Sequence, residues 1–241
     1  MSVSSSDIVF SRSANSGSSG GGIGGGVITD NVKNNLFDDI IDSERIAGGT
    51  RYKKWFISNQ NSIDSFEKPV VWISTGPRGM GDAIGLGWNS ADDSDPLQGN
   101  IIAIGTSGQL VLASSGTDTR TITLVGITAA GNPETENIAL TGATPVTTAK
   151  SWGTLYAAKA TAIHAVTVSI FETGGSRLIG TIALNKICTW RWLSPASFAG
   201  GLRLPTMGPE TYWGLWERIT WNAGIDGARP NYSNISVQED F

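Results

Sequence analysis

Apolar and polar residues alternate along much of the chain, the pattern of strands that bury one face. The alternation is clearest in residues 119–126, Thr-Arg-Thr-Ile-Thr-Leu-Val-Gly. Clusters of Gly, Pro, Asn, Asp and Ser separate the runs, and strands that recur about every 8–12 residues are typical of a sandwich or barrel. The pattern therefore predicts an all-β fold. The predicted strands and short apolar runs are residues 7–10, 51–58, 69–74, 83–88, 100–105, 109–113, 119–126, 136–141, 152–158, 162–171, 177–184, 201–205, 211–221 and 235–237.

Residues 211–221 differ from the other runs because both faces of this strand are apolar. Tyr212 and Trp216 share one face, whereas Trp213, Leu215 and Ile219 share the other. A strand with large apolar groups on both faces is predicted to lie inside a sheet that is covered on both sides.

The N-terminal region has a different composition. Ser and Gly make up 12 of the 16 residues in 11–26, and such a segment on its own cannot bury enough apolar area to offset its ordering entropy. It predicts a flexible Gly/Ser-rich arm that carries the short apolar piece Ile8, Val9 and Phe10. We expect this piece to dock on the sheet edge of a neighbouring subunit, so that deletion of residues 1–26 spares folding and weakens assembly.

Composition and charge exclude several classes of function. Charged residues make up 16% of the chain and its net charge is −4, without a basic block, so a nucleic-acid partner is not expected. No apolar stretch is long enough to span a membrane, and the N-terminus lacks the features of a secretory signal. Cys188 is the single cysteine, which excludes an intrachain disulfide and favours assembly in a reducing cytoplasm.

Residues that could carry catalysis or bind a cofactor are few. The single histidine, His164, lies in a predicted strand, and Cys188 beside Trp190 is better interpreted as a small buried apolar residue. One His and one Cys do not form a usual zinc site. Residues 20–25 match G-x-G-x-x-G, but they follow no strand and precede no helix. Residues 92–100 resemble a calcium loop without its bidentate Glu, so a solvated loop is expected.

Carboxylates and tryptophans give two further hypotheses, each with a structural alternative. Glu134 and Glu136 would point the same way in one strand, as an acidic pair for sugar cleavage requires, but surface carboxylates explain them equally well. Tryptophans within predicted strands could form platforms for sugars, although core packing is the commoner use. The tryptophans concerned are Trp72, Trp190, Trp192, Trp213, Trp216 and Trp221.

Three segments form a recognisable combination. Residues 32–59 contain Leu-Phe-Asp-Asp, then Ser-Glu, and end with Ala-Gly-Gly-Thr-Arg-Tyr-Lys-Lys-Trp-Phe-Ile-Ser-Asn. Residues 70–74 are Val-Val-Trp-Ile-Ser. Residues 208–218 are Gly-Pro-Glu-Thr-Tyr-Trp-Gly-Leu-Trp-Glu-Arg, followed near the end by Ile-Ser-Val-Gln-Glu. Together they resemble virion structural proteins of tailed bacteriophages, in which an acidic turn, glycine and a Tyr-Arg strand open a β-domain and a Gly-Trp-Arg strand closes it. Lys53 stands where such proteins often carry Arg.

Residues 125–148 are also similar to a β-sandwich module common in phage particles. Together, these similar segments cover about half of the chain. The resemblance implies no catalytic residues. Within the opening segment, Gly48 and Gly49 are predicted to make a turn that feeds a core strand, anchored by Tyr52 and by Trp55 or Phe56. The acidic turn before them is expected to be solvated or to face a neighbour.

The sequence thus predicts an all-β chain with three parts. Residues 1–35 form the N-terminal strand and arm, residues 36–80 with 199–241 form a β-sandwich, and residues 81–198 form an inserted β-rich module. The expected function is a non-enzymatic structural subunit of a bacteriophage tail or baseplate. Its expected partners are other virion proteins and copies of itself, without a cofactor, nucleic acid or membrane. A capsid decoration protein, a carbohydrate-binding module and a glycosidase are the alternatives.

Overall fold

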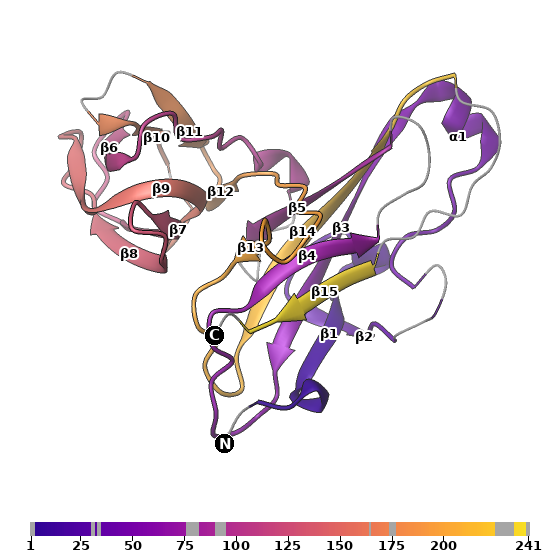
Figure 1. Ribbon diagram of the computed structural model, residues 1–241. Helices are drawn as coiled ribbons and strands as arrows, with labels where there is room; N and C mark the ends of the chain where they lie inside the picture. Colours follow the sequence, from indigo (N-terminus) through magenta and orange to yellow (C-terminus); the bar gives the residue numbers. More distant parts are fainter. Residues whose placement is uncertain are drawn as a thin grey trace. The chain divides into compact units, whose positions relative to one another are not determined.

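The computed structural model describes residues 3–29, 32, 35–75, 82–89, 95–163, 165–173, 177–224 and 234–239. Nearly all regular structure in these residues is antiparallel β-sheet, so the predicted all-β, sandwich-like fold is confirmed (Figure 1). The helical elements are short: η1 (Ser5–Asp7), η2 (Ser16–Ser18), α1 (Asp42–Ala47) and η3 (Pro96–Gln98). The strands are β1 (Ile8–Ser13), β2 (Ile23–Val27), β3 (Gly49–Asn59), β4 (Val70–Thr75), β5 (Ala83–Asn89), β6 (Gly108–Ser114), β7 (Thr121–Thr128), β8 (Pro133–Ala139), β9 (Val146–Ala160), β10 (Val168–Phe171), β11 (Leu178–Ile182), β12 (Cys188–Trp190), β13 (Leu202–Arg203), β14 (Tyr212–Trp221) and β15 (Asn234–Gln238).

The chain divides into two compact units. Unit 1 comprises residues 1–86, 193–202 and 206–241, and unit 2 comprises residues 87–192 and 203–205. The sequence-based division placed the inserted module at residues 81–198 and treated residues 1–35 as a separate part. In the structure, residues 1–35 belong to unit 1.

The centre of unit 1 is the pair β3–β14, in a five-stranded sheet of order β2-β1-β3-β14-β5. The two strands pair antiparallel through ten positions, from Gly49 opposite Trp221 to Ser58 opposite Tyr212. On β14, Leu215 and Trp216 point to opposite faces, and both are fully buried. The prediction that this strand lies inside a sheet covered on both faces is therefore confirmed.

A helix precedes β3; Gly48 lies between them, and Gly49 is the first residue of β3. Gly48 caps the C-terminus of α1, has a φ of 69° and donates its N–H to the carbonyl of Arg45. A Cβ on Gly49 would lie 2.8 Å from the ring of Trp221, so this position also requires glycine. Trp55 and Phe56 are buried, as expected of core anchors.

The N-terminal arm is the part of the fold that differs from the prediction. β1 pairs with β3, and β2 pairs with β1, so this segment forms a β-hairpin at the side of the sheet (Figure 1). Glycine allows the two strands of this hairpin to approach closely, because a Cβ on Gly25 would lie 2.2 Å from the carbonyl oxygen of Ser13. Gly24 and Gly26 have φ values of 153° and 86°, which other residues rarely adopt.

A smaller sheet of order β13-β4-β15 also belongs largely to unit 1, and β4 is its middle strand. Val70 and Val71 of β4 are fully buried, and Trp72 packs edge-on against Phe198 with ring centroids 5.6 Å apart. Apolar side chains on both faces of β4 are consistent with its middle position.

Unit 2 contains a seven-stranded sheet of order β11-β10-β6-β9-β7-β8, in which β12 also pairs with β9. Its alternating strands direct one set of side chains into a single core that includes Leu112, Leu124, Trp152 and Ile170. Residues 100–105, a short apolar run in the sequence, form no strand; their backbone runs beside β11.

Candidate functional site

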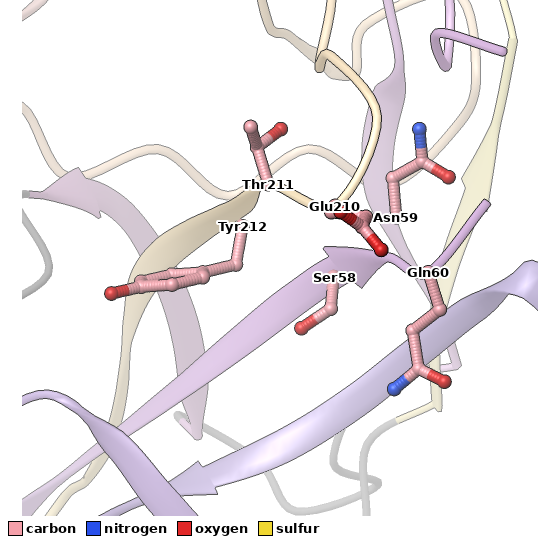
Figure 2. A pocket seen from close by; sticks show the side chains of 6 residues that line it. All are labelled: Ser58, Asn59, Gln60, Glu210, Thr211 and Tyr212. Atoms are coloured by element: carbon pink, nitrogen blue, oxygen red, sulfur yellow. The ribbon is translucent and has the colours of Figure 1, made fainter. Parts of the chain in front are cut away.

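A pocket lies in unit 1 where β3 ends and β14 begins, and its volume is about 350 Å³ (Figure 2). Its lining consists of Ser58, Asn59, Gln60, Glu210, Thr211 and Tyr212. The antiparallel pairing places these residues together, because Ser58 lies opposite Tyr212 and the N–H of Asn59 donates to the carbonyl of Thr211. The site is therefore formed by two segments that are about 150 residues apart in the sequence.

Asn59 lines the site and connects the two adjoining loops through its side chain. Its side chain is buried, and its Nδ2 lies 2.9 Å from the carbonyl oxygen of Asp64, 3.2 Å from that of Gly208 and 3.4 Å from that of Met207. Its Oδ1 accepts the N–H of Asn61 at 3.1 Å. The amide of Asn59 is thus occupied by structural hydrogen bonds.

A second set of hydrogen bonds connects the loop after β3 to the N-terminus. Asn61 Nδ2 donates to Asp7 Oδ2 at 3.2 Å, and the N–H of Gln60 donates to the Asp7 carbonyl at 2.7 Å. The backbone N–H and hydroxyl of Ser4, together with Asn61, lower the pKa of Asp7 below its ordinary value. Because a lowered pKa favours the folded state above the ordinary Asp pKa, this anchoring is lost as the pH falls through the folded-state pKa of Asp7.

The remaining lining residues offer hydrogen-bonding groups and one aromatic ring. Tyr212 is 44% exposed and packs edge-on against Phe56, with ring centroids 5.7 Å apart. Glu210 is the single carboxylate of the lining and has a φ of 51°. The six lining residues include no Cys, His, Lys or Arg.

The three residues predicted for docking lie beside this site. Ile8, Val9 and Phe10 stand opposite Asn59, Ser58 and Ile57 of the same chain, in β1. Phe10 packs against Trp55 with ring centroids 5.6 Å apart. The predicted docking of this strand on a neighbouring subunit stays a prediction, and within one chain it occupies the edge of β3.

The other residues singled out in the sequence have structural roles where they are described. Glu134 forms an ion pair with Lys150 at 2.8 Å, and Glu136 accepts the backbone N–H groups of residues 149 and 150. The two glutamates do point the same way, but toward β9. Cys188 is buried, and Asp95 accepts the N–H of Leu97 at the start of η3. His164 and residues 92–94 lie outside the described residues. Residues 20–25 belong to the β1–β2 hairpin, and the described residues directly after it, Ile28 and Thr29, are not helical.

The tryptophans divide between the core and half-buried positions. Trp190, Trp216 and Trp221 are buried, as core packing predicts, whereas Trp72 and Trp192 are half-buried. Trp192 packs edge-on against Trp190. A row of exposed tryptophans, which a sugar platform would need, is not found among the described residues.

The described residues contain no group of three or more His, Cys, Asp or Glu side chains that could hold a metal ion. Among these same residues, no helix combines the length and the apolar character needed to span a membrane.

Comparisons with protein-family models, with curated proteins and with solved structures find no match to this chain.

The Asn59 hydrogen bonds lead to a stability prediction. Replacing Asn59 with Ala leaves three carbonyl groups and one N–H without this partner, so we expect the free energy of unfolding of unit 1 to fall by about 2–3 kcal/mol. Chemical denaturation monitored by tryptophan fluorescence measures the change. Gln60→Ala is the matched control, because the side chain of Gln60 makes no hydrogen bond to other described residues, and we expect a change below about 0.5 kcal/mol. Equal effects of the two substitutions would contradict a special role for Asn59.

Proposed function

We propose that this chain is a structural subunit of a tailed-bacteriophage particle, in the tail or baseplate, and that it acts by assembly and not by catalysis. The observation that carries the proposal is the pairing of β3 with β14. The segments that resemble the opening and closing units of virion proteins, residues 32–59 and 208–218, are far apart in the sequence but supply the two central strands of one sheet. This arrangement is expected if the opening and closing segments belong to one β-domain.

Exposed apolar residues also support an assembly role. Ile41 and Ile46, at the two ends of α1, are 57% and 61% exposed. They lie in the acidic segment of the resemblance, where the charged side chain of Glu44 is held by Arg51. Apolar groups that remain exposed on such a segment suit contacts with a neighbouring subunit.

Particles purified from the source of this sequence provide the test. Peptides of this chain should be present in the particles by mass spectrometry, and gold-labelled antibody should bind at the tail or its tip in electron micrographs. Label over the head would favour a capsid decoration protein instead. Absence of both peptides and label from intact and opened particles would overturn the virion proposal, and glycan binding at the pocket beside Tyr212 would then be the hypothesis to examine.

A further inference from the structure

The strand orders of the two larger sheets end at β2, β5, β8 and β11, and these four strands differ in how their free edges are protected. The chain itself covers two of these edges. The backbone groups of Leu86 in β5 exchange hydrogen bonds of 2.6 and 2.9 Å with those of Leu193. Beside β11, Asn100 hydrogen-bonds both the N–H and the carbonyl of Thr181, and the N–H of Ile102 donates to the carbonyl of Ile179.

Charge and proline protect the third edge. β8 begins at Pro133, which has no N–H to offer a further strand. Glu134 and Glu136 follow. Glu134 forms an ion pair with the ammonium of Lys150, and Glu136 accepts the backbone N–H of Lys150. Proline and charged side chains on an outer strand are the usual devices against pairing with another chain.

In the described part of the chain, β2 has none of these devices, although its pairing with β1 is irregular between Ile23 and Val27. Its sequence is Ile23-Gly-Gly-Gly-Val27, and residues 24–27 are exposed, with Val27 59% exposed. Residues 13–29 carry no charged side chain, and β2 contains no proline. The edge therefore presents a backbone that neither charge nor side-chain bulk blocks.

We propose that β2 is a self-association edge, at which β2 of one copy pairs antiparallel with β2 of a second copy around a twofold axis at Gly25. This inference deepens the proposed assembly role by naming the edge and the partner. The sequence of β2 has a β-branched residue at each end and glycines between, so it is similar in both directions about Gly25. Antiparallel pairing at Gly25 therefore places Ile23 of each copy opposite Val27 of the other. A twofold contact uses the same patch on both copies, and an uncharged patch brings no like charges together. Pairing would join two five-stranded sheets into one continuous sheet.

Sedimentation velocity of the purified full chain, from about 1 µM to about 1 mM, tests the proposal. We expect a concentration-dependent dimer whose dissociation constant rises at least about tenfold in Val27→Lys, because each copy then brings a charge to the edge. Ile63→Lys is the matched control: Ile63 is 73% exposed in unit 1 but away from β2, and its dimer should equal that of the wild type. A monomer throughout this range, or equal effects of the two substitutions, would overturn the proposal.

Cross-linking tests the register. In the double variant Ile23→Cys/Val27→Cys, mild oxidation should give a covalent dimer, whereas Ile63→Cys, the control, should remain monomeric. Failure to cross-link would reject this register. A dimer in solution together with particles that lack the chain would reject only the virion proposal, and a monomer found in particles would reject only the self-pairing of β2.

Discussion

Deleting residues 1–27 is expected to destabilise unit 1 severely, lowering its free energy of unfolding by at least about 4 kcal/mol. The deletion removes β1 and β2, so five paired positions of β3, from Trp55 to Asn59, lose their partner strand. It also removes Phe10, which packs against Trp55. Unpaired backbone groups and newly exposed aromatic surface on a central strand both oppose folding, and the bare edge of β3 would promote aggregation.

Urea denaturation of the two chains, followed by tryptophan fluorescence and near-ultraviolet circular dichroism, measures this loss. A chain lacking only residues 1–3 is the control, because it keeps the whole of η1 and β1, and its stability should lie within about 0.5 kcal/mol of the wild type. Wild-type stability of the longer deletion would instead favour the free arm that the composition of residues 11–26 suggests.

The ordered structure of these N-terminal residues could not be predicted from local sequence patterns. A Gly/Ser segment is disordered by itself because it buries little apolar area, but here an existing sheet supplies its hydrogen bonds. Gly25 lies where a side chain would collide with Ser13, and that requirement leaves no periodic signal in the sequence. The alternation of β7 and the two-faced apolar pattern of β14, by contrast, follow from side-chain geometry alone and were predictable.

The candidate site was hardly predictable for a related reason. Its two halves meet through a pairing between residues 58 and 212, and strand pairing over such a distance is not encoded in local periodicity. A partial signal exists in Asn59-Gln-Asn61 directly after a strand, since Asn favours turns in which its side chain bonds the backbone. Buried charges give even less signal: Lys54 is fully buried over the ring of Trp216, 5.5 Å from its centroid.

Replacing Arg45 with Met is expected to lower the free energy of unfolding of unit 1 by about 3–5 kcal/mol. Arg45 lies in α1, its side chain is 1% exposed, and its guanidinium donates to Asp82 Oδ1 at 2.7 Å. The Asp82 side chain is fully buried, so removing its cation leaves a carboxylate charge without compensation in a region of low dielectric constant. Denaturant unfolding measures the loss, and Lys150→Met in the exposed pair with Glu134 should cost less than about 1 kcal/mol.

The double variant Arg45→Met/Asp82→Leu separates two free energies: the cost of leaving the Asp82 carboxylate buried without its cation, and the stabilisation that the ion pair contributes. Among the described residues, Arg45 Nε and Asp82 Oδ2 have no hydrogen-bond partner, so the buried pair is incompletely satisfied. Replacing both partners with apolar side chains should therefore recover most of the stability that Arg45→Met loses. If the double variant is as unstable as the sum of both single variants, the coupling energy between Arg45 and Asp82 is zero, and an orphaned charge does not explain the loss in Arg45→Met. Recovery to wild-type stability would instead mean that the sequence retains this pair for a reason other than stability.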